Sequence, residues 1–190
     1  MQSLPVEDDR MTTYHQLMGT ARQAFSEHAL ASMLASSLNG QSAMPERLGL
    51  DARLFRQMLA FHFPDASWPV AGADICTWDA AQMPEYNELK QLFSEYQASH
   101  VHQQPWWIEL LIVGCSGRNH LWADLGLFER GDLNLLMHSH FPGLAARNER
   151  DMKWKKFIYK QLCEREGIIA CPAPTCDACA HFSECFAPED

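Results

Sequence analysis

The sequence predicts an all-α protein, with a helical domain of about six or seven helices followed by an irregular, cysteine-rich C-terminal loop suited to metal. Three observations favour this fold. Apolar residues recur at three- and four-residue steps, as on one face of a helix, while strand-like alternation is almost absent. Hydrophobic residues make up 47% of the 190 residues, enough for a sizeable core. Four of the seven cysteines fall within the last twenty residues.

The N-terminal half is expected to hold three helices. The first covers residues 14–38, where apolar residues stay in helical step. Asp51 is expected to cap the second, because its side chain can accept hydrogen bonds from the free N–H groups of a first turn. Pro84 lies where a third helix can begin, and an apolar face follows over Tyr86–Tyr96.

The C-terminal half is expected to hold four more helices. They cover residues 105–113, 120–125, 133–140 and 148–166, and are ended in turn by Gly114, Gly126, Pro142 and Gly167. The predicted organisation is therefore a loose N-terminus over residues 1–10, a helical domain over 11–167 and a cysteine-rich tail over 168–190. Bound metal, rather than a regular element, should set the shape of this tail.

Charge and targeting signals narrow the class of protein. The formal charge of −9 disfavours a nucleic-acid-binding protein, which needs a basic face for phosphate contacts. The most apolar run, residues 106–113, is far shorter than the roughly 20 residues of a membrane span. The chain opens MQSLPVEDDRMTTYHQ, without an apolar signal region, so we expect a cytoplasmic protein whose cysteines stay reduced.

The strongest chemical signal is the run CPAPTCDACAHFSEC, with the spacing Cys-x4-Cys-x2-Cys-x5-Cys. Its four thiols, close enough in sequence to converge on one inorganic centre, are Cys171, Cys176, Cys179 and Cys185. Four soft ligands in so short a segment suit an iron–sulfur cluster or a zinc ion. An odd total of seven cysteines fits a disulfide framework poorly.

A second signal is a group of basic residues shortly before the cysteines. Its members step by three or four residues along the last predicted helix, and are Arg147, Arg150, Lys153, Lys156 and Lys160. This spacing predicts one broad cationic stripe. Such a stripe is either a solvated face that keeps the helix soluble, or a site for an oxyanion or an acidic partner.

Histidines are weaker candidates for an accessory ligand. His138 and His140 stand at the end of a predicted helix, and His181 lies inside the cysteine segment. The helix dipole also favours histidine at a C-terminus, so a structural role stays open for the first two. His120 and Asp124, four residues apart, could supply a ligand or form only a surface hydrogen bond.

The remaining cysteines, Cys76, Cys115 and Cys163, are predicted to be small buried hydrophobes. Cys163 could face a cluster, but it breaks the compact spacing of the other four. No nucleophile elbow, phosphate loop or dinucleotide fingerprint occurs.

The segment HLWADLGLFERGDLNLLMHSHFPGLAARNERDMKWKKFIYKQLCEREG, continuing into CPAPTCDACAHFSECF, resembles the NifQ family of nitrogen-fixation molybdenum-processing proteins. The resemblance is clearest over residues 106–186. It implies an iron–sulfur cluster that carries molybdenum, with Cys171, Cys176, Cys179 and Cys185 as ligands. It also implies that the protein is a carrier rather than an enzyme, and that it donates molybdenum to the iron–molybdenum cofactor of nitrogenase. The implied partners are the cofactor scaffold and the nitrogenase iron protein.

Molybdenum would arrive as molybdate, a dianion that a thiolate loop binds poorly, whereas a sulfide-rich cluster suits reduced or thiolated molybdenum better. Our hypothesis is that the basic stripe attracts this oxyanion, or docks an acidic partner, beside the cluster. Three alternatives stay open from the residues themselves. They are an iron–sulfur DNA glycosylase, a zinc-stapled helical interaction module and a ferredoxin-like electron carrier.

Overall fold

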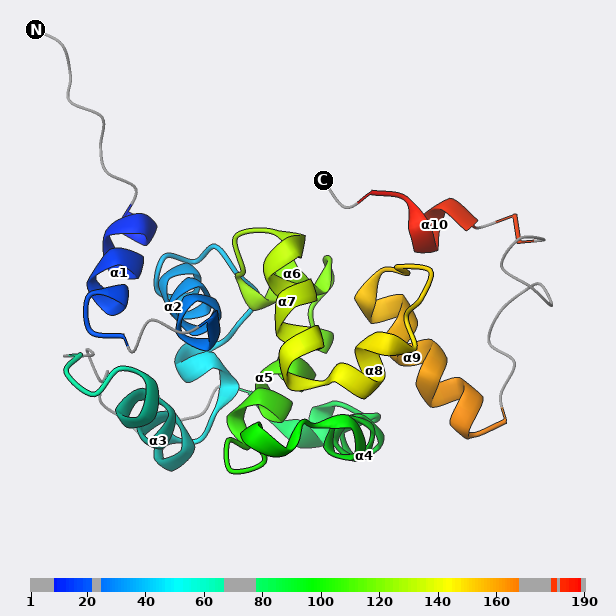
Figure 1. Ribbon diagram of the computed structural model, residues 1–190, viewed down its shortest axis with the longest axis horizontal. Coiled ribbons are helices and arrows are strands. Elements are labelled where there is room, and N and C mark those ends of the chain that lie inside the picture. Colours follow the sequence, from blue (N-terminus) through cyan, green and yellow to red (C-terminus); the bar gives the residue numbers. More distant parts are fainter. Residues whose placement is uncertain (1–8, 22–24, 67–77, 168–178, 181, 189–190) are drawn as a thin grey trace, which may run out of the picture.

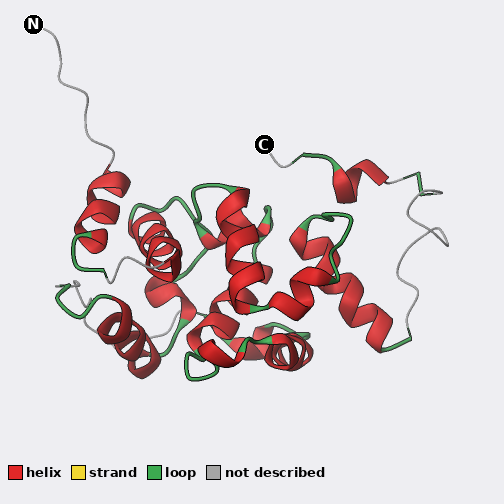
Figure 2. Ribbon diagram, in the orientation of Figure 1, coloured by secondary structure: helices red, strands yellow, loops and turns green. Residues whose placement is uncertain are grey.

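The structure is a computed structural model, and it describes residues 9–21, 25–66, 78–167, 179–180 and 182–188. Within these ranges the chain forms ten α-helices and three short 3-10 helices, with no β-strand (Figure 2). The predicted all-α class is therefore confirmed. The 3-10 helices are η1 (Glu46–Gly49), η2 (Ala80–Gln82) and η3 (Ser99–Val101).

The first predicted helix is in fact two, α1 (Asp9–Met18) and α2 (Phe25–Leu38). The chain turns after Met18, where the Gly19 N–H donates to the His15 carbonyl (2.9 Å) and the Thr20 hydroxyl donates to the Leu17 carbonyl (2.9 Å). The two helices pack against each other. Their apolar residues are buried in the same core, which is why one continuous pattern was predicted. α1 also begins inside the segment that we expected to be loose.

The second predicted helix, α3 (Ala52–His62), is capped as expected. Asp51 Oδ1 accepts hydrogen bonds from the N–H groups of Arg53 and Leu54, both at 2.8 Å. These bonds satisfy two of the donors that a first turn leaves unpaired. The local chemistry of one side chain therefore fixes where this helix starts.

The core is organised around α5 (Trp106–Cys115), in which nine of the ten residues are buried. It packs against α3, α4 (Tyr86–Tyr96) and α6 (Leu121–Leu125) (Figure 1). Gly114 does not break α5, contrary to the prediction. A Cβ at this glycine would lie 2.7 Å from Leu125 Cδ2, so the missing side chain is what lets α6 approach. α6 ends at Gly126, whose φ of 80° completes the predicted turn.

The C-terminal part contains α7 (Arg130–His140), α8 (Pro142–Ala146), α9 (Trp154–Arg165) and α10 (Phe182–Phe186) (Figure 1). Pro142 ends α7 as predicted, but it also begins α8, as proline favours the first turn of a helix. The last predicted helix over 148–166 starts only at Trp154. The tail holds the regular element α10, which the prediction of a purely irregular loop missed.

Within the described part of the chain, none of the helices has the length and apolar content that a bilayer span requires. Residues 64–72 (PDASWPVAG) have the composition of a loop. Residues 64–66 are non-helical, and the others lie outside the described residues. The boundary at residue 168 between helical domain and tail also falls outside them, so the division into domains stays a prediction.

Candidate metal centre

Two of the four predicted cysteine ligands, Cys179 and Cys185, belong to the described residues. Both residues are partly exposed. Cys171, Cys176 and the accessory candidate His181 lie outside the described residues. Within the described ranges alone, no group of three or more His, Cys, Asp or Glu residues is arranged to hold a metal ion. The four-ligand site therefore stays a prediction.

Cys179 and Cys185 are linked by the short helix α10. The Phe182 N–H donates to the Cys179 carbonyl (3.2 Å), and the Ala187 N–H donates to the Ser183 carbonyl (2.9 Å). The rings of Phe182 and Phe186, one helical turn apart, stack with centroids 4.4 Å apart. Local hydrogen bonds and one aromatic pair therefore shape this end of the tail.

α10 lies against the connection between α8 and α9. The Lys153 N–H donates to the Cys185 carbonyl at 2.8 Å. The Arg150 guanidinium lies 5.6 Å from the centroid of the Phe182 ring and 5.3 Å from that of Phe186. Cys185 and Phe186 also pack on the hydrophobic core. The basic segment, by which we mean residues 147–160, is thus in direct contact with Cys185, one of the predicted ligands.

The predicted cationic stripe on one helix is wrong. Only Lys156 and Lys160 belong to α9; Arg147 follows α8, Arg150 lies in the turn between the helices, and Lys153 precedes α9. The helical spacing failed because residues 147–153 do not continue a helix.

Four of the five basic side chains have partners in the structure. Arg147 Nε donates to Gln161 Oε1 (2.6 Å), and Lys160 Nζ is 3.5 Å from Glu164 Oε1. Arg150 faces the two aromatic rings of α10, and Lys156 Nζ lies 3.9 Å from Glu184 Oε2. The basic segment therefore divides into residues that contact α10 and residues that contact the helical domain.

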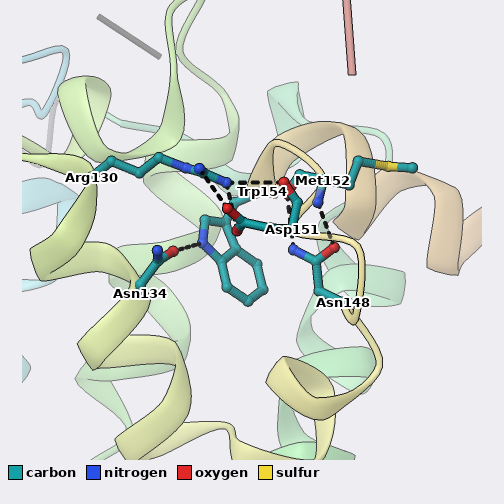
Figure 3. A network of polar contacts seen from close by, with 6 residues as sticks. All are labelled: Arg130, Asn134, Asn148, Asp151, Met152 and Trp154. Atoms are coloured by element: carbon teal, nitrogen blue, oxygen red, sulfur yellow. Dashed lines mark hydrogen bonds and ion pairs between the residues drawn. The ribbon is translucent and has the colours of Figure 1, made fainter. Parts of the chain in front are cut away.

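A polar network holds the connection between α8 and α9 onto α7 (Figure 3). Arg130 binds the Asp151 carboxylate with both terminal nitrogens, at 2.9 and 2.8 Å, and Asp151 adopts a left-handed φ of 54°. Trp154 Nε1 donates to Asn134 Oδ1 (2.6 Å). Both partners come from α7, so the connection has a fixed position relative to the helical domain.

Asn148 stabilises the same connection through two hydrogen bonds to the backbone of Met152. Its side-chain nitrogen donates to the Met152 carbonyl and its side-chain oxygen accepts from the Met152 N–H, both at 2.9 Å (Figure 3). This pair of bonds bends the chain across the residues between them, including Arg150. The turn that carries Arg150 is therefore held by hydrogen bonds within the chain.

The two histidines of α7 differ in their surroundings. His138 is exposed in the last turn of α7. His140 is buried, with its Nε2 3.1 Å from Ser26 Oγ and its ring 4.4 Å from the Trp107 ring. Burial, together with the nearby rings of His100 and His62, lowers the pKa of His140 to about 4. His140 therefore has the contacts of a neutral core histidine, and its predicted role as an accessory ligand has no support from them.

Asp124 pairs with Lys155, a residue that we did not identify from the sequence. The carboxylate is 1% exposed; its Oδ2 accepts from Lys155 Nζ and from the Asn119 N–H (2.9 Å). The expected contact with His120 is a helical backbone bond, from the Asp124 N–H to the His120 carbonyl. The pair with Lys155 joins α6 to α9, which makes Asp124 a structural residue.

The isolated cysteines differ in burial. Cys115 is buried at the end of α5, and this burial raises the pKa of its thiol to about 12. Cys163 on α9 is partly exposed, and Cys76 lies outside the described residues. The prediction of a small buried hydrophobe is confirmed for Cys115. A thiol that stays protonated is a poor metal ligand, because thiolates bind metals.

Sequence reasoning missed the residues through which α10 docks. Phe182 and Phe186 are four residues apart, which is the spacing of neighbours on one helix face. This signal was present, but the density of cysteines around it led us to expect no helix. Glu184, which faces Lys156, carries no signal in the sequence beyond its charge.

Comparison with known proteins identifies relatives over most of the chain. A family model described as NifQ matches residues 29–187. Protein NifQ of Azotobacter vinelandii is 35% identical over 170 residues, covering 84% of this chain and 87% of the relative. Protein NifQ of Klebsiella pneumoniae is 35% identical over 153 residues, covering 77% and 90%. A protein NifQ homolog of Sinorhizobium fredii is 32% identical over 166 residues, covering 85% and 72%. No solved structure matches this chain.

Proposed function

The chain belongs to the NifQ family, and we propose that it is an iron–sulfur protein of nitrogen fixation that binds molybdenum. We further propose that it donates this molybdenum for the iron–molybdenum cofactor of nitrogenase. The observation that carries the proposal is the extent of the family match, which runs over residues 29–187 and so includes all four tail cysteines. The role is that of a carrier rather than an enzyme.

The donor set suits the proposed cluster. Four thiolates from Cys171, Cys176, Cys179 and Cys185 are the ligands that iron–sulfur clusters use. Partial exposure of Cys179 and Cys185 supports a carrier, because a group to be handed over must be reachable by the acceptor. When bound, the cluster would supply sulfide for reduced or thiolated molybdenum. The molybdenum itself is cargo.

Basic residues beside Cys185 support the charge balance of such a site. A cluster held by four thiolates is anionic, and nearby Lys and Arg side chains favour thiolate over thiol. Arg150 and Lys156, which contact α10, are placed to provide this charge. We retain attraction of molybdate, or of an acidic partner, as a proposed second role of the basic segment. The proposed partners are the cofactor scaffold and the nitrogenase iron protein, in the cytoplasm.

The test is elemental analysis of protein isolated without oxygen from cells supplied with iron and molybdenum. We expect iron, acid-labile sulfide and molybdenum in the wild type, and loss of all three in C179A and C185A. The matched control is C115A, which removes a buried thiol and should retain the metals. Zinc in place of iron would support a zinc-stapled module. Salt-sensitive DNA binding would support the glycosylase alternative, and iron and sulfide without molybdenum would support a ferredoxin-like carrier.

A further inference from the structure

Three contacts between the basic segment and the tail surround a single residue, Cys185. The Cys185 carbonyl itself accepts the Lys153 N–H at 2.8 Å. Glu184, immediately before it, faces Lys156 at 3.9 Å. Phe186, immediately after it, lies under the Arg150 guanidinium at 5.3 Å. The docking contacts therefore hold the stretch of backbone that carries this cysteine.

The side that receives α10 is held by hydrogen bonds in which the tail takes no part. Asn148 closes the turn around Arg150, and the bidentate pair of Arg130 with Asp151 ties that turn to α7. Trp154, the first residue of α9, is hydrogen-bonded to Asn134 of α7. All of these partners belong to the helical domain. The surface that receives α10 is thus held by contacts among residues 130–154.

We propose that Arg150 is a positioning residue that holds Cys185 against the helical domain before the metal–sulfur group is bound. A guanidinium 5.6 and 5.3 Å from two ring centroids gives a cation–π contact that orients α10, and the Lys153 hydrogen bond then sets its register. Cys185 is thereby a pre-positioned ligand of the tail. This inference rests on the proposed function for its metal, but the docking itself concerns only contacts within the chain.

The Lys153 amide reports the docking directly. It lies just before α9, so its hydrogen-bond acceptor is the Cys185 carbonyl and not a residue of its own helix. The Phe157 N–H, which donates to the Lys153 carbonyl at 2.9 Å, reports instead on the first turn of α9. Comparing hydrogen exchange at these two amides separates release of α10 from fraying of α9.

Exchange is measured by NMR on the full-length, reduced and metal-free chain. In R150A we expect the Lys153 amide to exchange about tenfold faster than in the wild type, while Phe157 stays unchanged. R150K should show a smaller increase, since lysine keeps the charge but lacks the planar group. The matched control is R147A, because Arg147 contacts Gln161 and Tyr96 rather than α10. Equal exchange of Lys153 in the wild type and R150A would overturn the docking.

The positioning role is tested on the metal-loaded protein. After anaerobic reconstitution with iron and sulfide, R150A should lose iron to a chelator several-fold faster than the wild type, whereas R147A should match the wild type. Equal rates in R150A and the wild type would overturn the positioning role even if the amide confirms docking. If the wild type binds no iron at all, the proposed function fails and the positioning role with it. The Lys153 amide still decides the docking in that case.

Discussion

The ion pair between Lys155 on α9 and Asp124 on α6 gives a sharp prediction for stability. Asp124 is 1% exposed, and it accepts hydrogen bonds from Lys155 Nζ and from the Asn119 N–H. Lys155→Met keeps most of the side-chain volume but leaves a buried carboxylate with one neutral donor. Removing one member of a buried pair costs about 3–5 kcal/mol. Because the Lys155 side chain is 17% exposed and the Asn119 donor remains, we expect a loss of about 3 kcal/mol in the free energy of unfolding.

The assay is urea unfolding of the metal-free chain, followed by circular dichroism. The control is Lys156→Met at the next position, where the cation faces Glu184 and both side chains are more than half exposed, at 56% and 57%. An exposed pair is worth about 0–1 kcal/mol, so this variant should unfold close to the wild type. Replacing Asp124 by asparagine in the K155M background should recover part of the loss. If K155M and K156M unfold at the same urea concentration, the carboxylate is not desolvated and the reasoning is wrong.

Three further predictions follow from burial. Burial raises the pKa of the Cys115 thiol to about 12, so at pH 8 it should react with iodoacetamide about a thousandfold more slowly than an ordinary thiol. Unfolding in urea should abolish this difference in rate. Mass spectrometry of the alkylated peptides measures both rates. His140 has a folded pKa of about 4 against 6.5 unfolded, so the unfolded chain binds the proton first and stability falls as pH drops from about 6.5 to 4. The loss is on the order of 3 kcal/mol, and H140Q should remove that part of the pH dependence of urea unfolding. Gly114→Ala should cost about 1–3 kcal/mol in thermal or urea unfolding, because the new Cβ would meet Leu125 at 2.7 Å; an unchanged midpoint would show that α6 can move away.

Features set by neighbours in the sequence could be predicted. The Asp51 cap depends on N–H groups two and three residues away, and the end of α6 depends on a glycine that can adopt positive φ. The apolar run that became α5 is so uniform that its burial followed from composition alone. The predictions of these elements were correct because residues close by in the sequence determine them.

The elements near the candidate site depend on contacts between residues far apart in the sequence. The predicted helix over 148–166 loses its first turns because Asp151 takes a left-handed conformation and pairs with Arg130, which lies 21 residues earlier. No periodicity in the sequence encodes that pair. The hydrogen bond from Lys153 to Cys185 joins residues on either side of most of the cysteine segment, and residue spacing does not predict it either. This explains why the predicted arrangement of the basic residues along one helix was wrong.

The new arrangement changes what the basic segment can do. A solvated stripe would leave its cations available to any anion, but Arg150 faces Phe182 and Phe186, and Lys156 faces Glu184. An oxyanion or acidic partner that binds Arg150 or Lys156 would therefore bind a side chain that also contacts α10. Under the proposed function, anion binding and the docking of Cys185 would draw on the same two cations. Arrival of the anion would then be coupled to the position of this predicted ligand.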